Sequence, residues 1–487
     1  MKIAFINPPD KNTVIELPNE KGDSFLEADD YGHFPPLGLL YVLSYLEKHT
    51  TGHEFFFFDC PSELMSHEDL RTKLEAIKPD VVAVTSFTIS LVDVVLAAKT
   101  AREISPHAHI CLGGHHPIAY PHEAAELPYF DSIVVGEGEM AFTQLILALE
   151  NKSDITTILG VYTKESLKTA EAPVKDRRFL NSVIVKPAYV DDINTLPFPN
   201  RRYMRHIKYQ SVVGVSDNLA TILSSRGCPY ACTFCNVPYK RYRERSPADL
   251  CNEIEECLEL GYKEFHFYDD LFNITPQKVI TFCDELDRRG LKITWDFRGR
   301  VNGVDRESLV RAKKSGLRMI SFGVETGSEE GLRVLRKGTT LQKVRDAFRI
   351  CKEVGILTIA DYMIGLPHER TRQDILDNID FLVYDLNPDY AQFNILTLYP
   401  HTEAYDQAVE KKIIEPGRWH AFALNPTTGF RVDHWEEHLS LNELIDLYKL
   451  AYRKFYFRPK YILKSVLRTK SPYEFLAKFR GALKLVG

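Results

Sequence analysis

Two blocks of short apolar segments, each segment followed by a helical pattern, make up most of the 487-residue chain. Strands that alternate with helices are typical of parallel sheets joined by crossover helices. The strands predicted in the first block are Lys2–Asn7, Glu54–Asp59, Val81–Phe87, His109–Gly113 and Ser132–Val135. The chain is therefore predicted to be an α/β protein that begins with a doubly wound parallel sheet.

The second block predicts six strand-helix units, which is the pattern of a partial parallel (β/α)6 barrel. Its predicted strands are Thr221–Ser225, Glu264–Asp270, Ile293–Arg300, Met319–Glu325, Leu357–Gly365 and Ala391–Leu398. We expect a sheet domain at 1–151, a proline-rich linker at 152–217, the barrel at 218–402 and a mostly helical, basic and aromatic region at 403–487. Ligands of both architectures bind at the carboxyl ends of the strands.

Composition excludes several classes of protein. With 44% hydrophobic and 26% charged residues, the chain has the composition of a globular protein, and its net charge of -6 gives no general attraction for nucleic acid. No apolar run approaches the roughly 18 residues that a membrane-spanning helix needs, and the N-terminus is too short to be a secretory signal. Nine cysteines are too few for a disulfide scaffold in so long a chain. We expect a cytoplasmic protein with reduced cysteines.

Three cysteines stand in a C-x3-C-x2-C arrangement directly after the first strand of the second block. They are Cys228, Cys232 and Cys235. Three thiolates in one tight loop can hold three irons of a four-iron cluster, which leaves the fourth iron open to a ligand. Structural zinc is the alternative, but it usually takes four ligands in two spaced pairs, and no second pair lies nearby.

Polar and glycine-rich residues follow the strands of the first block. Glycines at such positions let a phosphate-bearing or bulky ligand approach the backbone, although they can equally serve only to make tight turns. No G-x-G-x-x-G follows the first strand, which disfavours a nicotinamide or flavin dinucleotide. The candidate ligand contacts are Ser86, Gly113, Gly114, His115, His116, Gly136, Glu137 and Gly138.

The cysteine motif, with Phe234 before its last cysteine, resembles that of the radical S-adenosylmethionine (SAM) superfamily. The resemblance implies that the three cysteines ligate a four-iron, four-sulfur cluster whose open iron is chelated by SAM. It also implies that one electron cleaves SAM to a 5'-deoxyadenosyl radical, which abstracts hydrogen from a carbon. The positions that match SAM contacts are Phe234, Tyr268, Asp269, Asp270, Arg300, Glu325 and Gly365.

These polar residues also have structural interpretations. Carboxylates can accept hydrogen bonds from ribose or from the amino group of SAM, and an arginine can pair with its carboxylate. A structural ion pair between Arg300 and Glu325 is the alternative, as is a helix N-cap role for Asp269 and Asp270.

The sheet ahead of the barrel resembles the cobalamin-binding subgroup, which includes class B methylases and anaerobic magnesium-protoporphyrin cyclases. The likeness rests on Pro35-Pro36-Leu37-Gly38-Leu39 and Gly113-Gly114-His115-His116-Pro117, and covers about Met1 to Thr402. It implies cobalamin at the carboxyl edge of the first sheet, with contacts from Leu37, Gly38 and the candidates above. Asn7-Pro8-Pro9-Asp10 stands where other cobalamin enzymes carry Asp-x-His-x-x-Gly, so no histidine of that loop is expected to bind cobalt. His115 and His116 are expected near the cofactor tail.

The chain past Tyr448 is basic and aromatic and resembles tails of the cyclase and hopanoid-associated branches. It could lie on an anionic membrane surface or neutralise an acidic substrate, or it could be a helical cap with a solvated basic face. Its basic residues are Lys449, Arg453, Lys454, Arg458, Lys460, Lys464, Arg468, Lys470, Lys478, Arg480 and Lys484.

The resemblance implies an enzyme that uses a 4Fe-4S cluster, SAM and cobalamin to methylate an unactivated carbon of a small molecule or lipid. An external one-electron reductant of the flavodoxin or ferredoxin type is the implied partner. Cyclase-like rearrangement or oxygenation of a tetrapyrrole or lipid is the alternative chemistry. A cobalamin- or cluster-binding sensor without turnover is the alternative from another class, and a nucleic-acid modifying enzyme comes third.

Overall fold

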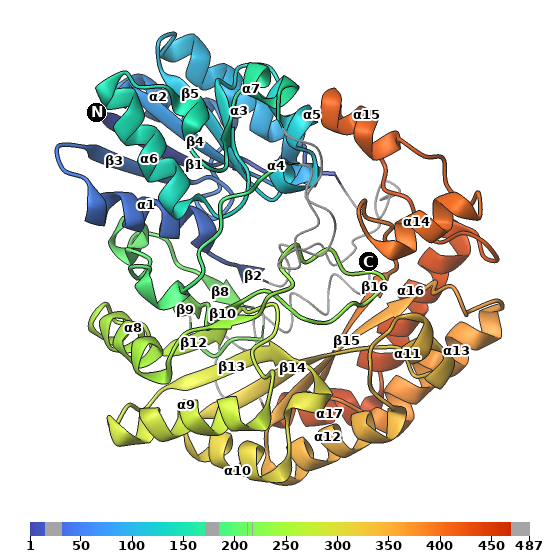
Figure 1. The fold of residues 1–487 in the computed structure, drawn as a ribbon. Helices are drawn as coiled ribbons and strands as arrows, with labels where there is room; N and C mark the ends of the chain where they lie inside the picture. The colour runs from blue at the N-terminus through green and yellow to red at the C-terminus, as the bar shows by residue number, and fades with distance from the viewer. Residues whose placement is uncertain (15–31, 171–184, 212, 217, 469–487) are drawn as a thin grey trace. The chain divides into compact units, whose positions relative to one another are not determined.

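The computed structural model describes residues 1–14, 32–170, 185–211, 213–216 and 218–468. Among these residues, contacts divide the chain into two compact units (Figure 1). The described residues of the first unit are 1–14, 33–170, 185–208 and 415–431, and those of the second are 32, 209–211, 213–216, 218–414 and 432–468. Each unit is built around one six-stranded sheet.

The first unit holds the predicted doubly wound sheet. Its order is β3-β1-β4-β5-β6-β7, from β1 (Lys2–Asn7), β3 (Glu54–Asp59), β4 (Val81–Ser86), β5 (His109–Gly114), β6 (Ser132–Val134) and β7 (Val161–Tyr162). The first five strands pair in parallel, as expected, while β7 pairs antiparallel with β6. Two residues are too few to show the alternation that marks a strand, so the sequence carried no signal for β7.

Helices cover this sheet on both faces. Helix α1 (Leu37–His49) packs on α6 (Gly138–Asn151), and α2 (His67–Ile77) packs on α3 (Leu91–Ile104). The right-handed crossovers of a parallel sheet place these two pairs on opposite faces. The short helices are α4 (His116–Ala119), α5 (Pro121–Glu126), α7 (Lys164–Lys168) and α15 (Arg418–Leu424), the last of which packs on α5.

The second unit confirms the predicted partial barrel of parallel strands. Its order is β16-β15-β14-β13-β12-β9, from β9 (Leu219–Ile222), β12 (Glu264–Phe267), β13 (Thr294–Gly299), β14 (Leu317–Glu325), β15 (Leu357–Ile364) and β16 (Tyr390–Ile395). Alternate residues of β12 and β13, Phe265, Phe267, Trp295 and Phe297, are fully buried in one core cluster with helix residues. The polar residues between them, such as His266 and Asp296, therefore lie on the other face of the sheet.

A layer of helices follows the strands and covers the outside of this sheet (Figure 1). These helices are α8 (Pro247–Glu259), α9 (Pro276–Arg288), α10 (Arg306–Lys314), α12 (Leu341–Val354) and α13 (Arg372–Asp380). The short helix α11 (Glu329–Val334) ends instead next to the cysteine motif, where the Thr233 N–H donates to the Leu335 carbonyl. The predicted helical C-terminal region is also present, as α14 (Glu403–Glu410), α16 (Leu441–Tyr456) and α17 (Pro459–Arg468).

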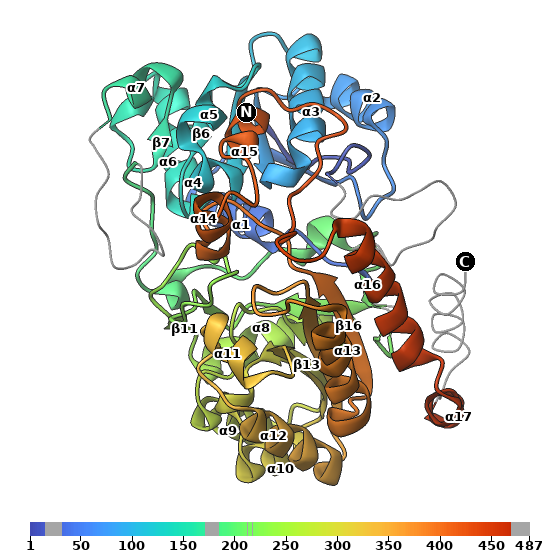
Figure 2. The same cartoon turned by 90° about the vertical axis from the view of Figure 1, so that its right-hand side faces the viewer.

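Helix α16 covers the free edge of the barrel at β16 (Figure 2). The Tyr452 hydroxyl accepts from the Phe393 N–H at 3.1 Å and donates to the same residue's carbonyl at 3.3 Å. The Tyr456 hydroxyl does the same at Ala391, at 3.1 and 2.8 Å. The spacings match because four helix residues rise about 6 Å and two strand residues about 6.6 Å. The tyrosines thus satisfy backbone groups that an open edge leaves unpaired.

Among the described aromatic residues of the tail, Tyr452 and Phe455 are therefore buried in the barrel core, and Tyr456 and Tyr461 pack against it, while Phe457 is exposed. On α17, by contrast, the apolar side chains of Ile462, Leu463 and Leu467 are exposed. Four basic residues of the tail lie outside the described residues, namely Lys470, Lys478, Arg480 and Lys484. Within the described part of the chain, no helix has the length and hydropathy needed to cross a bilayer.

Removing either tyrosine hydroxyl should weaken the barrel edge. Tyr452→Phe and Tyr456→Phe each leave a backbone N–H and carbonyl of β16 without a partner, which costs about 1–3 kcal/mol in unfolding free energy. Urea unfolding measures this loss, and hydrogen exchange should show faster exchange of the Ala391 and Phe393 amides. Tyr384→Phe is the matched control, because that side chain is 65% exposed. Unchanged exchange at both amides in the two variants would contradict the edge role.

Candidate active site

A two-stranded ladder closes the base of the cysteine loop. Strand β10 (Ser225–Arg226) pairs antiparallel with β11 (Arg243–Glu244), so residues 227–242 form a closed loop just after β9. At the start of the loop, Gly227 has φ +85°, and its N–H donates to the Asp270 carboxylate at 3.3 Å. A Cβ there would lie 2.6 Å from the Arg241 carbonyl oxygen, so only glycine fits where the two ends of the loop meet.

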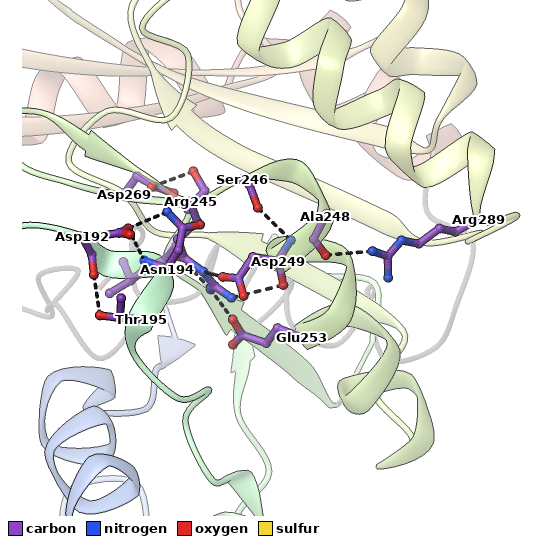
Figure 3. Close-up of polar contacts among 12 residues, drawn as sticks. Asp192, Asn194, Thr195, Arg245, Ser246, Ala248, Asp249, Glu253, Asp269 and Arg289 are labelled. Atoms are coloured by element: carbon purple, nitrogen blue, oxygen red, sulfur yellow. Dashed lines mark hydrogen bonds and ion pairs between the residues drawn. The ribbon is translucent and has the colours of Figure 1, made fainter. Parts of the chain in front are cut away.

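Arg245 ties the returning end of this loop to the barrel wall. Its N–H donates to the Ser224 carbonyl at 2.9 Å, and its buried guanidinium donates to Asp249 at 2.6 Å. The same guanidinium also pairs with Glu253, which lies one helical turn further along α8 (Figure 3). Ser246 caps α8 by accepting from the Asp249 N–H. Both ends of the loop are therefore fixed to one helix.

Asp269 and Asp270, which were predicted to contact SAM, also hold the loop in place. Asp269 accepts from the hydroxyls of Ser224 and Ser225 at 2.8 and 2.5 Å, and its other oxygen is buried without a partner. Thr275 is the N-cap of α9, so the N-cap interpretation of the two aspartates is wrong. Asp269 acts instead as an acceptor for hydroxyls at the end of β9.

The three cysteines are half-buried, while the other six are buried as expected. The Cys228 N–H donates to the Tyr239 carbonyl at 2.9 Å, and the Cys235 N–H donates to the Cys232 carbonyl at 3.2 Å. Burial raises the pKa of the Cys228 thiol, and it raises that of Cys235 to about 11. A bound cation is therefore needed to hold these thiols as thiolates near neutral pH, which is what iron ligation provides.

No three His, Cys, Asp or Glu side chains of the described residues gather where a single metal ion could be held. The fit of a cluster to this loop therefore depends on its donor chemistry, which is three thiols in a tight, anchored loop.

Arg300, at the end of β13, reaches the cysteine loop. Its Nη1 lies 3.3 Å from the Cys232 sulfur, and its guanidinium lies 3.9 Å from the centre of the Tyr230 ring. The side-chain amide of Asn273 bonds both the N–H and the carbonyl of Arg300, at 2.9 and 2.8 Å. The structure thus brings this predicted residue into direct contact with the predicted cluster ligands.

Glu325, at the end of β14, forms its ion pair with Lys337 at 3.0 Å, so the alternative of a structural ion pair with Arg300 is wrong. Burial raises the pKa of Glu325, and Lys337 opposes that rise. The residue has φ +68°, a conformation that is uncommon outside glycine. Lys337 also lies 5.8 Å from the Phe234 ring, so Phe234 and Glu325 share this neighbour. Tyr268 contacts Arg298, whose guanidinium lies 4.7 Å from its ring.

A buried amide organises the turn after β15, where Gly365 has φ +73°. The Asn378 amide donates to Glu369 at 2.5 Å and accepts from the Tyr362 hydroxyl at 2.6 Å. Glu369 accepts in turn from the Leu366 N–H at 2.8 Å. Burial raises the pKa of Glu369 to about 7, despite these hydrogen bonds to its carboxylate.

In the first unit, the ends of β4 and β5 form one candidate surface. The Ser86 hydroxyl donates to the Gly113 carbonyl at 2.7 Å, and the His115 N–H donates to the Ser86 carbonyl at 2.8 Å. The His115 ring stacks on Phe87, whose side chain is 54% exposed. A Cβ on Gly113 or Gly38 would meet nothing within 4 Å, so the backbone is open there. An open backbone beside a flat aromatic pair fits a large planar ligand.

Other predicted contacts of this unit are engaged within the protein. Gly136 admits the backbone of Ala188, whose oxygen would lie 2.2 Å from a Cβ, and Glu137 accepts from the Val190 N–H at 2.6 Å. Gly138 lets α6 approach Val42, and Leu37 is buried at the start of α1. These contacts favour the interpretation of close packing and tight turns for these positions.

His116 is fully buried, and burial lowers its pKa to about 3, so the ring is neutral. One ring nitrogen contacts the Thr88 hydroxyl at 3.1 Å, and Nε2 is buried without a partner.

In the loop after β1, Asn12 is bound to Asp93, which in turn pairs with His67 at 2.7 Å. Side chains of α2 and α3 thus anchor the loop after β1, where Asn7-Pro8-Pro9-Asp10 stands in place of the Asp-x-His-x-x-Gly motif.

Sequence reasoning missed three residues of these surfaces. Lys337 and Asn273 carry no local signal, because each acts on a residue at the end of another strand. Phe87 could have been found, since it is an aromatic residue directly after a predicted strand end.

Comparison with known proteins assigns both units. The Radical SAM superfamily model matches residues 222–382, and the B12 binding domain model matches 26–146. An uncharacterized methyltransferase of Pyrococcus horikoshii is 28% identical over 96% of this chain and 95% of its own length. The anaerobic magnesium-protoporphyrin IX monomethyl ester cyclase of Cereibacter sphaeroides is 29% identical over 84% of this chain and 63% of its own.

The fold agrees with a solved structure of OxsB, a cobalamin-dependent S-adenosylmethionine radical enzyme with aqua-cobalamin and S-adenosylmethionine bound. The TM-score is 0.69 at 17% identity, over 99% of this chain and 71% of the other. The barrel and its cysteine loop define a radical SAM enzyme. The chain thus contains a Radical SAM domain and a B12 binding domain, and these domains imply a 4Fe-4S cluster, SAM and cobalamin as its cofactors.

The close approach at Gly227 predicts a loss of cluster loading. In Gly227→Ala the added Cβ would clash with the Arg241 carbonyl, so the base of the loop must open, and we expect bound iron to fall at least several-fold. Gly261→Ala is the matched control, because Gly261 also has positive φ but no atom within 4 Å of its Cβ position. Iron and sulfide analysis after anaerobic reconstitution measures the difference. Equal loading of the two variants would contradict the steric account.

The buried Glu369 predicts a pH dependence of stability. Its folded pKa of about 7 lies above the ordinary value of 4.5, so the folded state binds the proton more tightly than the unfolded state. Stability should therefore fall as pH rises between these values, by up to about 3 kcal/mol, and this fall should be absent in Glu369→Gln. Urea unfolding across about pH 5 to 8 measures it, with Glu256→Gln, an exposed carboxylate on α8, as control. A parallel pH profile for Glu369→Gln would refute the assignment.

Proposed function

We propose that Cys228, Cys232 and Cys235 hold the 4Fe-4S cluster and that SAM binds beside them at the strand ends of the second unit. When bound, the cluster and SAM supply a 5'-deoxyadenosyl radical that abstracts hydrogen from a carbon. The observation that carries this assignment is the anchored cysteine loop directly after β9, with Arg300 in contact with Cys232.

The residues around this site have two kinds of role, holding the cysteine loop closed and facing SAM. Asp269, Asp270 and Arg245 keep the loop closed, so that three thiols stay near one another. Arg300 and the Glu325–Lys337 pair place charged groups at adjacent strand ends, where SAM presents an amino group, a carboxylate and ribose hydroxyls. Phe234 and Tyr268 supply aromatic surface within the same region. Gly365 starts the turn that Glu369 and Asn378 hold.

Cobalamin is proposed to bind at the carboxyl edge of the first sheet. The open backbone at Gly38 and Gly113 and the Phe87–His115 stack offer exposed surface for this ligand, while Gly114 packs closely on Ser86. Cobalamin supplies a cobalt centre that can carry a methyl group. His116 fits a neutral, buried role next to this surface, while Leu37, Ser86, Gly136, Glu137 and Gly138 shape it from below through contacts within the protein.

Methyl transfer to an unactivated carbon of a small molecule is the reaction that we propose. The support is the methyltransferase relative, which aligns over nearly the full length of both chains. Cyclisation remains the second candidate because a cyclase relative matches with similar identity. The mass of the product separates the two, since methylation adds one CH2 unit, and SAM with a deuterated methyl group would transfer its label.

An external one-electron reductant and a small-molecule or lipid substrate are the proposed partners. A peripheral membrane contact stays a prediction that rests on the basic and aromatic chain past Tyr448, and the exposed Ile462, Leu463 and Leu467 of α17 are compatible with it. The domain boundaries at 151, 217 and 402 likewise remain predictions.

The cluster assignment predicts that Cys232→Ala abolishes SAM cleavage. Loss of one of three thiolates should leave the cluster unstable and lower 5'-deoxyadenosine formation by at least about a hundredfold, as expected when an essential group is removed. Chromatography of dithionite-reduced, reconstituted protein with SAM measures the product. Cys351→Ala, at a buried cysteine on α12, is the control and should keep its cleavage activity. Retained cleavage in Cys232→Ala would overturn the assignment, and absence of cleavage in the wild type would favour a sensor.

A further inference from the structure

We propose that Arg300 sets the reduction potential of the cluster by donating a hydrogen bond to the Cys232 sulfur. This inference rests on the proposed assignment of the three cysteines to the cluster. It gives Arg300 a second role besides the predicted pairing with SAM.

The contact itself is direct. Nη1 of Arg300 lies 3.3 Å from Sγ of Cys232, which is a hydrogen-bond distance for a sulfur acceptor. Its guanidinium lies 3.9 Å from the centre of the Tyr230 ring, two residues before Cys232 in the same loop. A planar cation on an aromatic face is held in one orientation, so the N–H is aimed at the sulfur rather than swinging freely.

The backbone of Arg300 is fixed as firmly as its side chain. Asn273 is 1% exposed and bonds both backbone groups of Arg300 through its side-chain amide. Gly299 and Gly303 make this possible, since a Cβ on either would lie within 2 Å of an oxygen of Asn273. The Asn273 clamp therefore determines where β13 ends and how Arg300 leaves it.

The charge of Arg300 is not cancelled by an ion pair. Among the described residues no carboxylate pairs with it, and its Nη2 is buried without a hydrogen-bond partner. Glu325, with which an ion pair was the alternative, pairs with Lys337 and interacts with Arg300 only at longer range. Arg300 thus presents a positive, partly desolvated donor to the sulfur, and its second nitrogen remains available for a ligand.

Such a donor favours the reduced state. Reduction transfers one electron from the external donor to the cluster, whose total charge becomes more negative by one, and no bond of Arg300 is made or broken. Hydrogen bonds and positive charge next to a ligating sulfur stabilise the more negative state and so raise the potential. Arg300 therefore tunes the reduction potential of the cluster without itself gaining or losing an electron.

The test compares midpoint potentials of reconstituted full-length protein without SAM. Arg300→Met and Arg300→Lys are titrated with reductant and followed by electron paramagnetic resonance, after iron and sulfide analysis confirms loading. We expect Arg300→Met to favour the oxidised state by about tenfold, equivalent to about 59 mV for a one-electron couple, and Arg300→Lys to shift less because it keeps the charge. Asn273→Ala should shift the potential in the same direction through the displaced guanidinium.

Arg336→Gln is the matched control. It removes an exposed positive charge from a residue whose carbonyl lies 4.0 Å from the same sulfur, but it leaves the Arg300 bond intact. An unchanged potential in both Arg300 variants would overturn the proposal, as would an equal shift in Arg336→Gln. Loss of loading in both Arg300 variants would also overturn it, because Arg300 would then hold the cluster rather than tune it. Absence of any cluster in the wild type would instead overturn the assignment of the cysteines.

Discussion

The second unit depends on closing a 16-residue loop so that three thiols stay together. Uncompensated thiolates repel each other, and burial raises the pKa of the Cys228 and Cys235 thiols, so the cysteines alone do not hold the loop closed. It is held from its two ends. The β10–β11 ladder, the ion pairs of Arg245 with α8, and the two aspartates after β12 supply the anchors. The candidate cluster site is thus a product of neighbouring strand-helix units rather than of the cysteine motif only.

The same principle explains why charged residues gather at the ends of the barrel strands. In a parallel sheet every strand delivers its last residue to one edge, so residues far apart in the chain meet there. Arg300 meets Cys232 across 68 residues, and Asn273 meets Arg300 across 27. Each contact is short and fixed by a second one, which is what a site with defined geometry requires.

The C-terminal helix α16 acts as a cap on the barrel, which is one of the interpretations that the sequence left open. A barrel that does not close leaves the edge of β16 open, and α16 covers it with tyrosine hydroxyls. Of the described aromatic residues past Tyr448, Tyr452 and Phe455 are buried, and Tyr456 and Tyr461 pack against the same core. The interleaved lysines and arginines could not decide between a cap and a membrane-surface helix, because a helix that packs on one side and is solvated on the other has the same composition.

Local patterns determined the strands, helices and cluster loop of this protein, because apolar periodicity and short motifs act over a few residues. All six barrel strands and the first five strands of the N-terminal sheet were predictable for this reason, and the spacing of the three cysteines was enough to single them out as candidate cluster ligands. Which side chains pair with each other was decided only by the tertiary structure. Whether Glu325 pairs with Arg300 or Lys337, and whether Gly136 faces a ligand or Ala188, depends on which strand ends and loops become neighbours. The side chains that pair are close in space but far apart in the sequence, so no local sequence pattern predicts which of them meet.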